Sequence, residues 1–190
     1  MLVRKLSLLD KNRIIDNLVT LQGEDRRLRF GSLCTDDYIK EYVTKSFEQE
    51  SKWFGVDHIN GHLVATCHVA YDKEQNVAEL GLTVSADYRN QKLGQQLFDR
   101  GVTWARMNGA ENIFMHCLTE NKVIQHIARK GGMTVVTYDM GEKEGTIKVN
   151  KNQIVAGFQD AIMENMALYD QTIRTQQWFF NKFMKRILGR

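Results

Sequence analysis

The chain has 190 residues, 43% of them hydrophobic and 26% charged, which favours a soluble globular protein of one domain with an appended helix. Its formal net charge of +3 is too small to indicate nucleic-acid binding, and no apolar run reaches the roughly 18–20 residues that a membrane helix needs. Three widely spaced cysteines, Cys34, Cys67 and Cys117, argue against a disulfide scaffold or a zinc cluster and predict reduced thiols in a cytoplasmic protein.

The N-terminal part of the chain predicts one strand followed by two helices. Residues 3–8 favour a strand, and Asp10 can cap a helix that ends at Gly23. The charged segment 24–30 is interpreted as a connection. Thr35 begins a second helix, because two acidic residues follow it in the first turn.

Three strands follow in the sequence. Residues 53–59 and 62–71 predict a hairpin whose Asn60-Gly61 turn is of type I′. The third strand, 77–84, alternates between two faces. One face carries Ala78, Leu80, Leu82 and Val84, and the other carries Glu79, Gly81 and Thr83.

A polar loop, DYRNQKLG (87–94), connects this strand to a helix that is predicted to end at Gly109. A loop that leads into a helix N-terminus presents free backbone N–H groups and the positive end of the helix dipole. Such a place favours an anion, and phosphate suits it best. Arg89 and Lys92 add side-chain charge there, although Lys92 would be costly if its φ had to be positive.

The next elements complete an α+β domain. Residues 113–118 predict a strand, 121–130 a helix stopped by two glycines, and 133–140 and 145–150 two strands separated by GEKEG. This order predicts αβα layers, in which helices flank a mixed, mostly antiparallel sheet. The strand, helix and strand on either side of the polar loop form the only obvious parallel crossover.

The segment 151–190 differs from the domain before it. Its apolar residues recur at three-and-four spacing, which predicts one long amphipathic helix or two helices separated near Thr175. A straight helix of about 35 residues would be near 50 Å long and would favour a homodimer. The basic end of the segment leaves open a membrane-surface or nucleic-acid contact, although no nucleic acid is expected.

The stretch VSADYRNQKLGQQLF resembles the acetyl-CoA loop of the Gcn5-related N-acetyltransferases, the GNAT superfamily, in a bacterial-type form. Four residues match its pattern V-x-P-x-x-R-G-x-G-x-G/A-x-x-L: Val84, Arg89, Gly94 and Leu97. Ala86, Asn90 and Lys92 depart from it by replacing a proline and two glycines. Residues 113–133 resemble the superfamily's next strand, its asparagine (Asn121), helix and glycine-containing ending.

The resemblance covers residues 2–150 and implies a GNAT-like fold, with an acetyl-CoA-binding N-acetyltransferase domain at 1–150 and a helical extension at 151–190. It implies direct transfer of an acetyl group from acetyl-CoA to an amine, without a metal ion. The implied cofactor-binding residues are Leu82, Thr83, Val84, Arg89, Asn90, Gln91, Lys92, Leu93, Gly94, Gln95 and Asn121. It also implies a strand bulge near Gly81, with the pantetheine arm of the cofactor in the gap beside it.

Glu79 is the predicted general base. A lysine-like amine has a pKa near 10.4, so only about one molecule in 2,500 is neutral at pH 7, and a nearby carboxylate would help to remove the proton. A surface glutamate or a buried ion pair is the structural alternative for Glu79. His68 and His116 are the other candidate bases, although a strand histidine is more often packed and hydrogen-bonded.

The general acid and the acceptor stay open. Asn121 is predicted to cap a helix, and the resemblance also implies contact with the cofactor. Ala128 stands where many relatives carry a tyrosine acid. A catalytically degenerate module that binds a CoA ester or a protein partner is therefore the alternative. The acceptor could be a small amine, a polyamine, a lysine side chain or a protein N-terminus.

Overall fold

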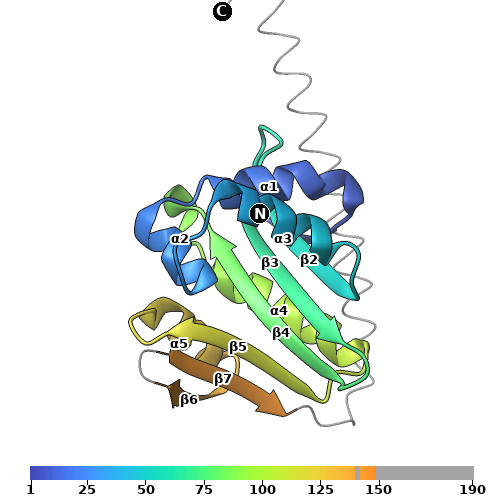
Figure 1. Cartoon of the computed structure of the whole chain (residues 1–190), viewed down its shortest axis with the longest axis vertical. Coiled ribbons are helices and arrows are strands. Elements are labelled where there is room, and N and C mark those ends of the chain that lie inside the picture. Colours follow the sequence, from blue (N-terminus) through green and yellow to red (C-terminus); the bar gives the residue numbers. More distant parts are fainter. Residues whose placement is uncertain (140–141, 149–190) are drawn as a thin grey trace, which may run out of the picture.

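The computed structural model describes residues 1–139 and 142–148 (Figure 1). The predicted extension 151–190, its homodimer contact and the domain boundary near 150 lie outside the described residues. No helix in the described part of the chain is long and apolar enough to cross a bilayer.

Seven strands form one sheet within these residues, in the order β1-β2-β3-β4-β5-β7-β6. The strands are β1 (Val3–Leu6), β2 (Ser51–Asp57), β3 (Leu63–Asp72), β4 (Val77–Val84), β5 (Asn112–Leu118), β6 (Thr134–Asp139) and β7 (Glu142–Lys148). All neighbours are antiparallel except β4 and β5, which are parallel. The mixed, mostly antiparallel sheet predicted from the element order is confirmed.

Helices cover both faces of this sheet. They are α1 (Lys11–Val19), α2 (Gly23–Phe30), α3 (Asp36–Ser46), α4 (Leu93–Met107) and α5 (Lys122–Lys130), with short 3-10 turns η1 (Leu8–Asp10) and η2 (Ala86–Tyr88). Figure 1 shows α1, α2 and α3 in front of the sheet and α4 behind it. Two separate clusters of buried apolar residues fill the space between the sheet and the helices, one under α4 and one under α1 and α3.

The alternating pattern of β4 determines which face meets α4. Ala78, Leu80 and Leu82 are at most 8% exposed and belong to the apolar cluster under α4. The predicted apolar stripe of α4 is buried in the same cluster: Leu93, Leu97, Phe98, Val102 and Ala105. The opposite face of β4 is therefore left for Glu79 and its neighbours.

The segment 24–30 is a helix, α2, so the predicted connection is wrong. Glu24 and Asp25 lie in its first turn and Arg27 in its last, which complements the helix dipole. Gly31, at φ +78°, ends the helix in the left-handed conformation. No residue of α2 is fully buried, so the helix lacks the apolar stripe on which the prediction depended.

Asp10 is the N-cap residue of α1, but its side chain makes no capping hydrogen bond to that helix. Its carboxylate instead pairs with Arg4 at 2.7 Å and with Arg13 at 2.7 Å. Both arginines also pair with Asp57 of β2. Burial alone would raise the pKa of Asp10. The hydrogen bonds and the positive charge of Arg4 stabilise the carboxylate more strongly, and the pKa falls to about 2.

Two turn predictions are also corrected. A type I′ turn needs positive φ at both central residues, but in the 60–61 pair only Gly61, at +86°, has it. The hairpin closes through a longer loop, in which the N–H of His58 donates to the carbonyl of His62 at 2.9 Å. Strand β7 begins at Glu142, so part of GEKEG belongs to the strand.

The parallel strands β4 and β5 pair over three residues only, from Val77↔Asn112 to Glu79↔Phe114. Beyond Glu79 they diverge, and Figure 1 shows α2 lying beside the open end of the gap. Helix α2 contacts both strands. The middle of the sheet therefore has an opening whose walls come from β4, β5 and α2.

Candidate active site

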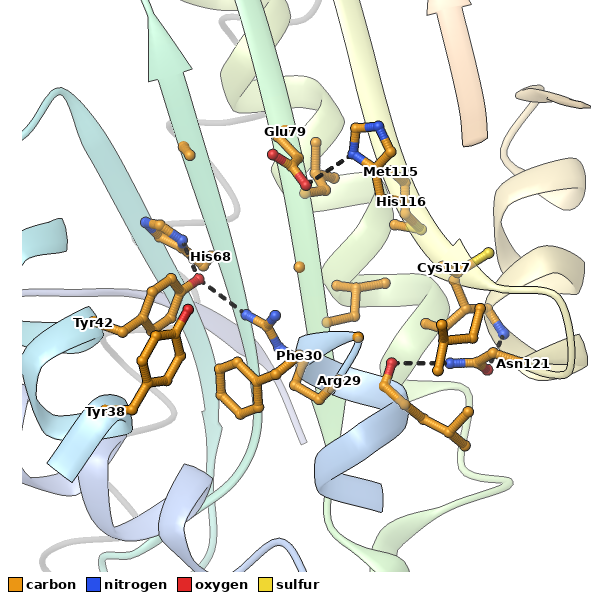
Figure 2. A pocket seen from close by; sticks show the side chains of 18 of the residues that line it. Arg29, Phe30, Tyr38, Tyr42, His68, Glu79, Met115, His116, Cys117 and Asn121 are labelled. Carbon is orange, nitrogen blue, oxygen red and sulfur yellow. Dashed lines mark hydrogen bonds and ion pairs between the residues drawn. The ribbon is translucent and has the colours of Figure 1, made fainter. Parts of the chain in front are cut away.

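Two cavities meet in the opening between β4 and β5. The loop cavity, of about 420 Å³, is lined by the end of β4, the loop after it, the start of α4 and α5. The sheet cavity, of about 380 Å³, is lined by β3, β4, β5, α2 and α3 (Figure 2). Five residues line both cavities: Leu28, Arg29, Leu82, Asn121 and Ile124.

The loop cavity brings together ten of the eleven residues predicted to bind the cofactor. They are Leu82, Thr83, Val84, Arg89, Asn90, Lys92, Leu93, Gly94, Gln95 and Asn121. Gln91 is exposed and does not line this cavity. One continuous stretch from β4 to α4 therefore forms one wall, and α5 forms the wall opposite.

The N-terminus of α4 opens into the loop cavity. Lys92 is its N-cap residue and provides no side-chain cap. The first intrahelical bond runs from the N–H of Gln96 to the carbonyl of Lys92, at 3.1 Å. The N–H groups before Gln96 therefore have no partner within the helix, and together with the helix dipole they favour an anion.

Two residues of this loop have positive φ, Asn90 at +61° and Lys92 at +62°. Asparagine tolerates the left-handed region, whereas lysine there costs roughly 1–2 kcal/mol. The costly case that the sequence left open for Lys92, a positive φ, is therefore the one that the structure shows. The turn into α4 needs the left-handed conformation, and the sequence places lysine there in spite of the strain.

Helix α2 is joined by ion pairs to both sides of the opening. Arg89, after β4, pairs with Asp25 at 2.7 Å, and Arg27 pairs with Glu120, after β5. These side chains are partly exposed, so each pair adds little to stability. They connect α2 to both sides of the opening, and the charge of Arg89 is shared with Asp25.

Asn121 lies where the two cavities meet. Its Oδ1 accepts the N–H of Ile124 at 3.2 Å, which confirms the predicted helix cap. Its Nδ2 donates to the carbonyl of Leu28 in α2 at 3.4 Å. The side chain thus connects the start of α5 with the helix that lies across the opening.

Glu79 stands at the rim of the sheet cavity with a side chain that is 55% exposed. Figure 2 shows it facing His116, whose Nδ1 lies 3.1 Å from Glu79 Oε1. The other ring nitrogen, Nε2, lies 3.1 Å from Glu144 Oε2. Partial burial alone would lower the pKa of His116, but the hydrogen bond to Glu79 and the two carboxylate charges raise it.

Gly81 has a different role from the expected one. The β3–β4 register runs without interruption from Ala65↔Val84 to Asp72↔Val77, so β4 has no bulge toward β3 at Gly81. The guanidinium of Arg29 covers Gly81 instead. A Cβ on Gly81 would lie 2.5–2.8 Å from the guanidinium atoms, so a larger residue there would require the flexible side chain of Arg29 to move.

Arg29 is a site residue that the sequence prediction missed. Its Nε donates to Thr83 Oγ1 at 3.2 Å, and its Nη2 donates to the hydroxyl of Tyr42 at 3.2 Å. Because 24–30 was interpreted as a connection, nothing placed Arg29 against β4. A signal was present: acids first and arginines last across eight residues that end at Gly31 are typical of a short helix.

His68 is buried, and Figure 2 shows it beside Tyr42. Its Nδ1 lies 2.7 Å from the Tyr42 hydroxyl, and its ring stacks on Trp53 at 4.5 Å between centroids. Burial and the positive charge of Arg29 lower the pKa of His68 to about 3. His68 is therefore neutral near pH 7, which favours a packing and hydrogen-bonding role over that of a base.

Two further positions limit the available chemistry. Ala128 is 2% exposed and packs in the apolar core, so it offers no proton to either cavity. Cys117 lines the sheet cavity, but burial raises the pKa of its thiol. A thiol with a raised pKa is a poor nucleophile, which disfavours an acyl-enzyme route.

Comparison with known proteins agrees with this arrangement. A family model described as "Acetyltransferase (GNAT) family" matches residues 16–133. A search of the curated proteins found no match.

Solved structures with a similar fold share little sequence with this chain. The GNAT domain of S. lividans PAT superposes with a TM-score of 0.64 at 16% identity, covering 77% of this chain and 89% of that one. The yncA protein of Salmonella typhimurium, solved with its cofactor acetyl-CoA, gives 0.61 at 13%, covering 79% and 94%. A ribosomal-protein-alanine N-acetyltransferase from Brucella melitensis gives 0.62 at 11%, covering 78% and 100%.

Proposed function

The chain belongs to the acetyltransferase (GNAT) family, and we propose that it transfers the acetyl group of acetyl-CoA directly to an amine of a small molecule or peptide. The observation that carries this proposal is the junction of the two cavities at Asn121 and Arg29. One cavity suits the cofactor and the other an acceptor, and they meet in the opening between β4 and β5. Three free cysteines support a reducing, cytoplasmic location.

The loop cavity has the features that the cofactor requires. Its pyrophosphate would accept from the free N–H groups at the start of α4, with Lys92 adding charge. Beyond Glu79 the backbone of β4 no longer pairs with β5, so Leu82–Val84 can pair with the pantetheine arm. Acetyl-CoA supplies an activated acetyl thioester, and no metal ion is needed for an amine to attack it.

Glu79 and His116 form the proposed base. An ammonium group must lose a proton before its nitrogen can attack, and Glu79 lies at the rim of the cavity where the acceptor would enter. His116, in contact with Glu79 on one side and Glu144 on the other, orients the carboxylate and can pass the proton to solvent. The carboxylates of Glu79 and Glu144 also give this rim a negative field that attracts a cationic amine.

The leaving thiolate needs no tyrosine on α5 in this proposal. A simple thiol has a pKa near 8.5, so it leaves readily near neutral pH, and water or the departing ammonium proton can neutralise it. The buried Ala128 is the observation that favours the second candidate, a module that binds a CoA ester or a partner without turnover.

Two measurements test the proposed function. Acetyl-CoA at 100 times its dissociation constant should stabilise the fold by about 2.7 kcal/mol, seen as a rise in Tm. A panel of amines should then release CoA thiol in the presence of acetyl-CoA. A Tm shift without CoA release for any amine would favour the non-catalytic module, and no Tm shift would contradict both functions.

The pH profile of kcat/KM should rise above pH 6.5 and then level off. Below the raised pKa of His116, the ring is a cation that stabilises the Glu79 carboxylate and makes it a weaker base. Above that pKa the ring is neutral, and this effect disappears. His116→Gln should move the rising limb to lower pH. An unchanged limb in that variant would assign the titration to another group, and a falling limb near pH 9–10 would indicate a tyrosine acid.

A further inference from the structure

We propose that the acceptor is an α-amino acid, whose carboxylate binds Arg29 while its amine faces Glu79. This inference rests on the proposed function and names the substrate class of the same site.

Arg29 is the arginine of α2 for which the described side chains provide no carboxylate partner. Its neighbours in the helix are both paired: Arg26 with Asp36 at 2.7 Å, and Arg27 with Glu24 at 2.8 Å. No carboxylate of residues 1–137 and 143–148, the part of the chain whose side chains are described, lies within ion-pair distance of Arg29. A half-buried guanidinium without a counterion is costly, and a bound anion removes that cost.

The contacts of Arg29 hold it in place without neutralising it. Its hydrogen bonds go to two uncharged hydroxyl groups, those of Thr83 and Tyr42. The guanidinium also lies 4.9 Å from the centre of the Phe30 ring and 5.7 Å from that of Tyr42. These contacts use Nε and Nη2, whereas the structure gives Nη1 no partner among the described residues. A positioned guanidinium with open N–H groups is suited to bind a carboxylate.

Glu79 provides the opposite charge on the same face of β4. Arg29 lies over Gly81, which is two residues from Glu79 on the same face of β4, so their positions on the strand are about 7 Å apart. In an α-amino acid the nitrogen and the carboxyl carbon are about 2.5 Å apart. The outer carboxylate oxygen is roughly 3.5 Å from the nitrogen, so with a hydrogen bond of about 2.8 Å at each end the molecule spans roughly 9 Å.

The two ends also suit the two charges of this molecule chemically. Figure 2 shows Arg29 and Glu79 bordering one cavity, with His116 beside the carboxylate. Arg29 also lines the loop cavity, so a carboxylate bound to it would place the amine near the junction with the cofactor site. A plain amine or a protein N-terminus would leave Arg29 without its anion.

The test compares each L-amino acid with its own amide, in which the carboxylate becomes a neutral group of the same shape. The initial rate of CoA release should give a kcat/KM that is about 10- to 100-fold higher for the acid than for the amide. Arg29→Gln should reduce this ratio to near one, and Arg29→Lys should restore part of it. Arg129→Gln is the control, because Arg129 is exposed on α5 and lines neither cavity.

Acetyl-CoA binding, measured by calorimetry on every variant, shows that the cofactor site is intact. A ratio near one in the unmodified protein, or an equal loss for acid and amide in Arg29→Gln, would overturn the inference while the proposed function stands. An equal loss for acid and amide would indicate that Arg29 acts on the thioester of acetyl-CoA. If no amine is turned over, the proposed function fails. Calorimetry of amino acids with the CoA-bound protein then decides the inference, because Arg29-dependent binding supports it and its absence overturns it.

Discussion

Glu79→Gln should lower kcat by roughly 10²- to 10⁴-fold, the range typical for the loss of a general base. The amide keeps the size of the side chain and can still bond to His116, but it cannot accept a proton from the amine. Acetyl-CoA affinity should stay unchanged, because Glu79 does not line the loop cavity. Steady-state rates of CoA release, together with calorimetry of acetyl-CoA binding, measure the two quantities separately.

Glu74→Gln is the matched control for this variant. Glu74 is exposed in the turn before β4 and lies outside both cavities, so the same change there should leave kcat unaltered. Normal turnover in Glu79→Gln would make Glu79 structural. Normal turnover in Glu79→Gln combined with a large loss in His116→Gln would instead make His116 the base.

Gly94→Val should weaken acetyl-CoA binding by at least about 100-fold. Gly94 lies in the first turn of α4, where an anion must come close to the backbone. A Cβ there would already lie 2.9 Å from Ile127 Cδ1 on the opposite wall, and two further methyl groups would add bulk where the pyrophosphate must approach the backbone. Calorimetric titration with acetyl-CoA gives the change in Kd directly.

Gln96→Val places the same side chain two residues later on α4. Gln96 is exposed and does not line the loop cavity, so the cofactor should bind this variant normally. Comparison of the two Tm values without cofactor shows whether Gly94→Val also disturbs the packing against Ile127. Unchanged affinity in a folded Gly94→Val variant would mean that the pyrophosphate binds elsewhere.

The backbone of the loop shows where a sequence pattern is insufficient. The residues of the loop cavity were named from the resemblance, but the positive φ of Lys92 was not expected. A residue's type sets only the cost of a conformation, whereas the path between β4 and α4 decides whether the chain adopts it. The strain at Lys92 therefore follows from the positions of two packed elements.

The sequence by itself determined the features that depend on nearby residues. Alternation placed Glu79 and Thr83 on the face of β4 away from α4, and the helix cap at Asn121 needs contact only with Ile124. Both patterns extend over a few positions, and hydrogen bonding or burial at that range follows from residue type and spacing.

Only the tertiary structure decided how the acceptor side is built. Arg29 reaches Thr83, 54 residues away, and His116 reaches Glu79, 37 residues away. No residue of helix α2 is fully buried, so the sequence has no apolar stripe that predicts this helix. Its position across the opening depends on contacts with β4 and β5. No local pattern encodes such contacts, because they arise when packing of the sheet and helices brings distant charges together.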